Sequence, residues 1–294
     1  MLCDVPALAM HAKSMNNKVC LVTGATNGIG FATATALAAQ GATVIVHGRN
    51  RTKGEHVVQE IMRTTGNEAV RFVQADFASL AQVRTLASEL NAQLPRLDVL
   101  VNNAALTSAE RKLTVDGHEL IFAVNHLAPF LLTHLLLDKM KASTPARIVV
   151  VSSAGHRIAK LDLDDLTNER KLGGMTVYGN SKLGNILFAR ALSRRLNGSG
   201  VTINALHPGG VRTNLGDNGG TWLKVMLKVL SFAAVPPAEG ARTSVYLASS
   251  PEVEGHSGGY YVKCKPAPMS DEARDDALAE RLWTKSCQLV GLPA

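Results

Sequence analysis

The chain has few cysteines, few aromatic side chains and no long run of charge of one sign. Its four cysteines lie far apart and form neither a CxxC pair nor a Cys/His ligand spacing. This distribution argues against a structural zinc site or a secreted disulfide framework and favours a reducing compartment. Residues 1–17 contain no signal-peptide pattern. We therefore expect no bound metal, and we expect a cytoplasmic protein.

Charge and long apolar runs are limited as well. Lys and Arg exceed Asp and Glu by 31 to 24, but they are scattered, and aromatic residues make up only 4%. A nucleic-acid-binding protein should show a basic stripe or a stacking motif, so we expect no nucleic-acid partner; an acidic cofactor explains the charge equally well.

Polar residues and a proline interrupt the most apolar segment, residues 120–137. A membrane span needs about 20 largely apolar residues, so we expect a buried helix there and no integral membrane segment.

What the chain does have is an alternation of short β-rich segments with helical patterns, which is typical of parallel βαβ units. It predicts one α/β domain over residues 18–294, a doubly wound parallel sheet (Rossmann fold) with helices on both faces, after a flexible extension at 1–17. Ser79 and Gln82 form a capping-box pattern. The expected strands are 18–23, 43–47, 70–74, 97–102, 147–152, 201–207 and 260–263. The expected helices are 28–40, 52–65, 79–93, 117–141, 176–197 and 238–250.

One insertion, at about residues 213–237, falls outside this alternation. It begins polar and glycine-rich and then turns apolar. Such a segment is often a lid, which would favour a lipophilic substrate. A core or oligomer helix and a membrane-surface helix remain alternatives.

The sequence TGATNGIG at residues 23–30 directly follows the first expected strand and opens a helix. Glycines in such a turn permit a tight bend, a close approach of backbone N–H groups to a pyrophosphate, and close packing of helix on strand. No Gly-Lys-Ser/Thr follows, which excludes a nucleotide-triphosphate P-loop. The motif predicts a dinucleotide site whose first contacts are Gly24, Thr26, Asn27, Gly28, Ile29 and Gly30.

The end of the second strand bears on the choice of cofactor. NAD specificity usually needs an acid about 20 residues beyond the glycines, at this position. Here the corner reads His47-Gly48-Arg49-Asn50, and the first acid is Glu55. A guanidinium fork suits a 2′-phosphate, so we predict that NADP(H) is preferred over NAD(H), with Arg49 and Asn50 among the contacts. A solvated surface arginine is the alternative.

Tyr178 and Lys182 are four residues apart in an expected helix, so they share a face. A lysine beside a tyrosine stabilises the phenolate and lowers the tyrosine pKa from about 10, which suits general acid/base work. The spacing alone is common, but VVVSS upstream places Ser153 at the end of the fifth strand. Ligands of parallel sheets bind beyond the carboxyl ends of the strands. Six successive strands end in candidate site residues: Gly24, Arg49, Asp76, Asn102, Ser153 and Pro208.

Together these motifs resemble the short-chain dehydrogenase/reductase family. TGATNGIG, NNAA at 102–105, Ser153 and YGNSK at 178–182 stand in the family's order, and the resemblance covers about residues 18–292. VNHL at 124–127, SKLGN at 181–185 and HPG at 207–209 are most similar to the retinol-dehydrogenase-like branch. The run 102–105 ends in alanine where many members have glycine, a change we expect to be tolerated. The N-terminal residues do not show the membrane anchor of that branch, so we do not expect membrane attachment.

The resemblance implies roles for these residues. Tyr178 would protonate the carbonyl oxygen, or deprotonate the alcohol, as hydride moves from or to the nicotinamide, and Ser153 would hydrogen-bond that oxygen. Lys182 would also hold the nicotinamide ribose, and Asn125 would fix a water for proton relay. Asp76 would meet the adenine. The further implied cofactor contacts are Phe77, Asn102, Ala104, Pro208, Gly209, Val211 and Thr213.

We therefore expect an NADP(H)-dependent oxidoreductase acting on a lipophilic alcohol or carbonyl compound. A catalytically idle NADP(H)-binding redox sensor or scaffold is an alternative, although it would not need Ser153, Tyr178, Lys182 and Asn125 together. An epimerase or dehydratase is another, although such enzymes usually have a larger segment after the residue matching Pro208. The substrate, the direction of reaction, and the choice among monomer, homodimer and homotetramer are left open.

Overall fold

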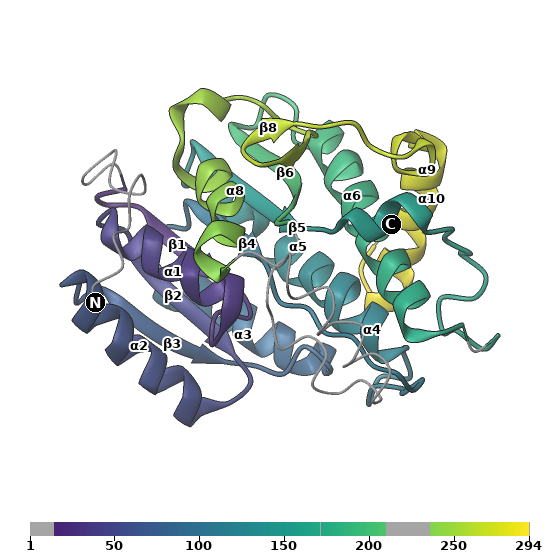
Figure 1. Cartoon of the computed structure of the whole chain (residues 1–294), viewed down its shortest axis with the longest axis horizontal. Helices are drawn as coiled ribbons and strands as arrows, with labels where there is room; N and C mark the ends of the chain where they lie inside the picture. The colour runs from purple at the N-terminus through teal and green to yellow at the C-terminus, as the bar shows by residue number, and fades with distance from the viewer. Residues whose placement is uncertain (1–14, 171, 210–235, 294) are drawn as a thin grey trace.

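A computed structural model describes residues 15–170, 172–209 and 236–293. Within these residues eight strands form one sheet in the order β3-β2-β1-β4-β5-β6-β7-β8 (Figure 1). All neighbouring strands are parallel except β7 and β8, which are antiparallel. The strands are β1 (Val19–Val22), β2 (Thr43–Gly48), β3 (Val70–Gln74), β4 (Val99–Asn102), β5 (Ala146–Val151), β6 (Val201–His207), β7 (Tyr260–Val262) and β8 (Lys265–Pro266).

The central strands are apolar on both faces because helices cover both sides of the sheet. Alternate residues of β1 point into two separate hydrophobic cores, one on each face of the sheet. Leu21 belongs to one core and Val22 to the other. Three helices pack on the Val22 side: α1 (Gly28–Ala39), α2 (Arg51–Thr65) and α8 (Pro237–Ser249). Of these, α1 lies against α8 (Figure 1). The Leu21 side is covered by α3 (Leu80–Gln93), α5 (Ala128–Lys141), α6 (Gly174–Arg195) and α10 (Asp276–Val290).

Short elements complete the described chain. They are α4 (Leu120–Phe122), the π-helical turn η1 (Ala123–Leu127), the 3-10 turns η2 (Ala154–Ile158) and η5 (Pro251–Val253), and α9 (Asp271–Arg274). The predicted doubly wound parallel sheet is confirmed. The last strand expected, 260–263, is present as β7, and a further short strand, β8, follows it because Lys263 and Cys264 turn the chain with φ of 50° and 60°. The helices α9 and α10 were not expected from the sequence.

The helix expected at 79–93 begins as predicted, but its capping box is only half formed. The Ser79 hydroxyl accepts a hydrogen bond from the Gln82 N–H at 3.4 Å. The Gln82 side chain does not return to Ser79; its Oε1 accepts from the Asp76 N–H at 2.9 Å. The cap therefore fixes the loop at the end of β3.

One helical segment among the described residues, Leu120–Lys141, is long and apolar enough to cross a membrane, with a mean hydropathy of 1.8. Of its most apolar stretch, 78% is buried inside the fold, as expected for a core helix. At the N-terminal side, Met15 is 5% exposed, and its N–H donates to the Gln40 carbonyl. Residues 15–17 therefore pack on the domain, whereas the rest of the expected extension and residues 213–235 of the expected lid lie outside the described residues.

Candidate active site

The glycine-rich turn between β1 and α1 has a backbone that side chains would obstruct. Gly24 has φ of 62°, and a Cβ there would lie 2.7 Å from the Ala104 Cα. A Cβ on Gly30 would lie 2.5 Å from the Gly24 carbonyl oxygen. The turn opens α1, whose first N–H groups have no partner within the helix and suit an anionic group. The backbone at this turn therefore fits a dinucleotide pyrophosphate.

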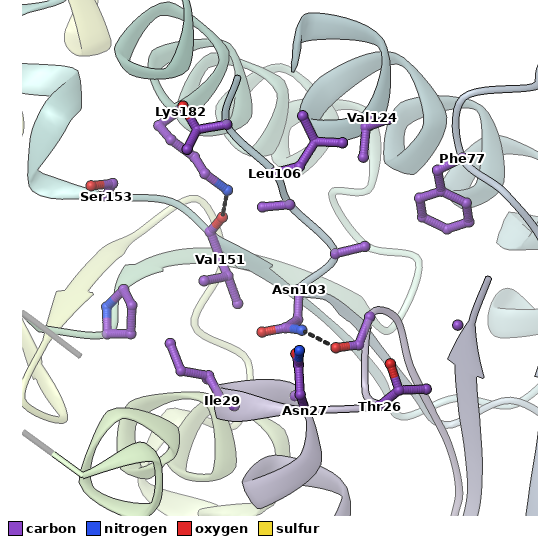
Figure 2. Close-up of a pocket in the computed structure, with 18 of the residues that line it drawn as sticks. Thr26, Asn27, Ile29, Phe77, Asn103, Leu106, Val124, Val151, Ser153 and Lys182 are labelled. Atoms are coloured by element: carbon purple, nitrogen blue, oxygen red, sulfur yellow. Dashed lines mark hydrogen bonds between the residues drawn. The ribbon is translucent and has the colours of Figure 1, made fainter. Parts of the chain in front are cut away.

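Hydrogen bonds to the end of β4 hold this turn in place. The Thr23 hydroxyl accepts from the N–H groups of Asn103 and Ala104 at 2.9 and 3.0 Å. The Asn103 side chain donates to the Thr23 carbonyl at 2.7 Å and lies between the turn and the opposite wall (Figure 2). The predicted contact Asn102 instead points into the core, where its Nδ2 donates to the Thr133 hydroxyl at 2.9 Å. The amide at this wall of the site is therefore that of Asn103.

A cavity of about 410 Å³ lies at the carboxyl ends of the strands. It brings together fifteen of the predicted residues: Gly24, Thr26, Asn27, Gly28, Ile29, Gly30, Arg49, Asp76, Phe77, Ala104, Ser153, Tyr178, Lys182, Pro208 and Gly209. Asn50, Asn102 and Asn125 are not among its lining residues. Val211 and Thr213 lie outside the described residues. Twelve further lining residues were not predicted from the sequence: His47, Gly48, Ala75, Asn103, Ala105, Leu106, Thr107, Val124, Val151, Ser152, Met175 and His207.

Asn50 has a local role in place of the predicted contact. It is the N-cap of α2, and its Oδ1 accepts a hydrogen bond from the Lys53 N–H at 2.8 Å. Asparagine is favoured at this position because it satisfies one of the free N–H groups of the first turn. A cap pattern before the helix was visible in the sequence and would have predicted this role.

Ser153, Tyr178 and Lys182 come from two elements that meet at the cavity. Ser153 follows β5 and caps η2, with its Oγ accepting from the Gly155 N–H at 3.2 Å. Tyr178 and Lys182 share a face of α6, and the Lys182 Nζ lies 5.6 Å from the centre of the Tyr178 ring. The Lys182 Nζ donates to the Val151 carbonyl at 2.9 Å, as Figure 2 shows. The hydroxyl, phenol and amine thus meet at one end of the sheet.

The electrostatics of this group differ from the expectation. Burial raises the pKa of Tyr178 to about 12, and a hydrogen bond with Ser153 acts in the opposite direction. Burial lowers the pKa of Lys182 to about 7. The residue is only 1% exposed, and its amine donates to a backbone carbonyl oxygen, which bears no negative charge. We expected the lysine to lower the tyrosine pKa; in this structure burial dominates, and Tyr178 is a neutral phenol near pH 7.

Asn125 positions the walls of the cavity without lining it. Its side chain is fully buried in η1, accepts from the Leu106 N–H at 2.8 Å, and donates to the Leu106 carbonyl at 2.9 Å. The same amide donates to the Ser181 hydroxyl at 3.0 Å, and Ser181 donates to the Tyr178 carbonyl at 2.7 Å. Both polar atoms of its side chain are therefore engaged within the protein, and the water relay expected of Asn125 stays a prediction.

His47 is a wall residue that the sequence analysis did not assign. Its Nδ1 accepts from the Gly24 N–H at 3.3 Å, and its Nε2 donates to the Ala75 carbonyl at 3.1 Å. The ring stacks on Phe77 with a centroid distance of 4.3 Å. Burial lowers the pKa of His47 to about 4, so the neutral tautomer joins three strand ends. A polar residue at the end of an otherwise apolar strand was the available signal.

Among the residues that the structure describes, no group of three or more His, Cys, Asp or Glu side chains could hold a metal ion.

The short chain dehydrogenase family model matches residues 18–224. The chain is a short-chain dehydrogenase. Human retinol dehydrogenase 14 is 44% identical to this short-chain dehydrogenase, over 95% of this chain and 88% of the relative.

Solved structures share the fold of this short-chain dehydrogenase. A protein from Mycobacterium paratuberculosis is 32% identical, with a TM-score of 0.79, over 98% of both chains. A short-chain dehydrogenase from Escherichia coli CFT073, complexed with NADPH, shares the fold at 24% identity and a TM-score of 0.69, over 86% of this chain and 99% of that one. The chain belongs to the retinol-dehydrogenase-like branch of a family of hydride-transferring oxidoreductases, and membership of this family supports a nicotinamide cofactor.

Proposed function

We propose that this short-chain dehydrogenase is an NADP(H)-dependent reductase of lipophilic aldehydes or ketones, with Tyr178 as its general acid and base. The observation that carries the proposal is a single cavity at which a glycine-rich turn meets Ser153, Tyr178 and Lys182. In the bound state the nicotinamide supplies or accepts the hydride. The residues of the chain bind and orient the cofactor and the substrate, and they move the proton.

The proton chemistry follows from the state of Tyr178. With its pKa raised to about 12, the phenol keeps its proton at neutral pH and is ready to donate it to a carbonyl oxygen. The Ser153 hydroxyl, hydrogen-bonded with the phenol, is available to orient the same oxygen. In the reverse direction the Tyr178 phenolate would take the alcohol proton, which is less favourable from a buried neutral phenol. The neutral phenol is the protonation state from which reduction of a carbonyl compound starts.

The preference for NADP(H) is supported by the charges at the adenosine side of the cavity. Arg49 lies on the wall, and its carbonyl accepts from the Gln74 side chain at 3.1 Å, which anchors the backbone of this corner. Asp76 is the only acid among the described lining residues, and its carboxylate accepts from the Ala78 N–H at 2.9 Å. At the end of β2, where an acid usually selects NAD, the chain has the Arg49 guanidinium, which suits a 2′-phosphate better than a 2′-hydroxyl.

A lipophilic substrate is supported by the side chains near Tyr178. Leu106, Val124 and Met175 line the cavity, and Met175 is 48% exposed although it is a large apolar side chain. Met175 precedes Tyr178 by three residues in α6, so both lie on one helix face. An apolar compound would shield this exposed surface beside the proton donor.

The experiment measures consumption of NADPH and of NADH with a panel of aldehydes and ketones, for the wild type, Tyr178→Phe and Arg49→Asp. We expect NADPH to be preferred, Tyr178→Phe to bind NADPH without turnover, and Arg49→Asp to lose the preference. Arg51→Asp is the matched control, because Arg51 is exposed, pairs with Glu55 and does not line the cavity. Equal activity of Tyr178→Phe would contradict the proposed acid; NADPH binding without turnover by the wild type would favour the idle scaffold.

The cytoplasmic location, the lid at 213–237 and a homodimeric or homotetrameric assembly stay predictions of the sequence. For the lid, polar substitution that leaves KM for long-chain carbonyl compounds unchanged would count against the prediction. For the assembly, light scattering of the purified chain gives the number of copies directly.

A further inference from the structure

A fully buried histidine that has no assigned role lies three residues after Ser153. His156 is 0% exposed, and its Nδ1 donates to the Ser153 carbonyl at 2.7 Å. This bond is added to the backbone bond from the His156 N–H to the same carbonyl at 3.2 Å. Because a carbonyl can only accept, the proton must be on Nδ1, and the tautomer is thereby fixed.

The other side of the ring is fixed by the C-terminal part of the chain. The His156 Nε2 accepts from the Ser270 N–H at 3.4 Å, and the Ser270 hydroxyl donates to the His156 carbonyl at 3.4 Å. Ser270 is also the N-cap of α9. The ring of Tyr260 in β7 packs edge-on against His156 at a centroid distance of 4.9 Å. The His156 ring thus connects the loop at Ser153 with the start of α9, and these two segments are far apart in the sequence.

A second histidine holds the same loop from the sheet. The His207 Nδ1 at the end of β6 accepts from the Ala154 N–H at 3.3 Å. The carbonyl of Ser153 and the N–H of Ala154 belong to one peptide unit, so both polar atoms of that unit are bound by histidine rings. A peptide unit held at both ends restricts the backbone from which the Ser153 side chain projects.

We propose that His156 is a positioning residue for Ser153, and that it orients the serine by tying its carbonyl to Ser270 and α9. The inference rests on the proposed function, because it assumes that the Ser153 hydroxyl orients the reacting oxygen. His156 itself does not line the cavity, so it acts only through Ser153. Substrate turnover then depends on a contact with the C-terminal segment, at a distance from the reacting atoms.

Two substitutions separate the hydrogen bond from the packing. His156→Phe keeps a ring against Tyr260 and removes both hydrogen bonds. His156→Asn keeps a side-chain N–H at about the place of Nδ1 and restores the bond to Ser153 alone. A misplaced catalytic group costs up to about 100-fold in rate, so we expect kcat of His156→Phe to fall by about 10-fold to 100-fold while its KM for NADPH changes little. His156→Asn should recover most of kcat.

The matched control is His134→Phe. His134 is a half-buried histidine whose Nδ1 likewise donates to a backbone carbonyl, that of Phe130, but it packs on Trp283 away from the cavity. We expect this variant to keep kcat. NADPH binding and the melting temperature of each variant show whether it is folded, and His156→Leu replaces His156→Phe if the latter is not.

The results distinguish a failure of this inference from a failure of the proposed function. If His156→Phe turns over like the wild type while Tyr178→Phe is inactive, His156 does not position Ser153 and the proposed function stands. If Tyr178→Phe is active, the proposed function fails, and a crystal structure of His156→Phe then tests the placement alone. An unchanged Ser153 in that structure would overturn the inference; a displaced Ser153 would support it.

Discussion

At the scale of single residues, the main finding is a lysine amine held in the core of the site, with no negative partner among the residues that the structure describes. Lys182 is among the largest fully buried side chains, and its Nζ donates to a carbonyl oxygen. The absence of a charge partner is why burial lowers its pKa to about 7. The fold therefore stabilises the neutral amine relative to the ammonium.

This pKa predicts how stability depends on pH. Below about pH 7 the amine is protonated in both folded and unfolded states, and the folded state bears the full penalty of burying the charge. Above pH 7 only the unfolded chain still binds the proton, so the free energy of unfolding rises with pH. Relative to Lys182→Met, we expect the wild type to gain up to about 1.4 kcal/mol per pH unit between about pH 7 and 9, measured by urea unfolding without cofactor. A pH-independent difference would contradict the lowered pKa.

A second prediction at this scale concerns the glycine-rich turn. Gly24→Ala adds a side chain where φ is 62° and where the Ala104 Cα is 2.7 Å away. Gly66→Ala has a similar φ of 69° but nothing within 4 Å, so it isolates the backbone penalty of about 1–2 kcal/mol. We expect both variants to lose that stability, and only Gly24→Ala to lose NADPH affinity in a titration. Equal affinity of the two variants would show that the turn does not need its close approach.

Residue identities in the site could be predicted where a motif fixes the backbone, as for Gly24, Ser153 and Tyr178. They could not be predicted where two neighbours compete for one place. Asn102 ends β4 and its amide goes to the core, whereas Asn103 leaves the strand and reaches the turn. The end of the strand at Asn102 was predicted, but successive side chains of a strand point to opposite faces, and the sequence pattern does not say which of the two asparagines turns its amide toward the site.

At the scale of elements, the π-helical turn η1 matters most, because it places Asn125 between the end of β4 and α6. Single π-helical turns are rare in proteins, and those that occur are often found at functional sites. The apolar pattern of residues 120–137 predicted a buried helix, which is confirmed, but hydrophobic periodicity does not reveal an extra residue in one turn. The side-chain contacts of Asn125 could not be derived for the same reason.

We expect Asn125→Asp to disturb this connection with little change in volume. The carboxylate can still accept from the Leu106 N–H, but it cannot donate to the Leu106 carbonyl, which is left unpaired. A buried polar group left without a partner costs about 1–3 kcal/mol. Thermal unfolding should show that loss, and kcat should fall because Ser181 and Tyr178 are held through the same contact. Wild-type stability would show that the amide does not connect the two elements.

At the scale of the whole molecule, the alternation of strands and helices was enough to predict the sheet and the edge at which ligands bind. The C-terminal part was less predictable. The hydrophobic residues of α10 are spaced for packing on α6, a long-range contact that local patterns do not specify. The contact of Ser270 with His156 is of the same kind, since the two residues are far apart in the sequence and are brought together only by the complete fold.

In the proposed reaction, hydride passes from the nicotinamide to a carbonyl carbon at this cavity, and Tyr178 supplies the proton. The most direct test is a single turnover with NADPH deuterated at either face of C4, in excess enzyme, with the best carbonyl compound of the panel. We predict that mass spectrometry finds one deuterium in the alcohol from one of the two labelled cofactors, and none with Tyr178→Phe, which still binds NADPH. Alcohol without deuterium from either cofactor, or equal transfer by Tyr178→Phe, would contradict the account.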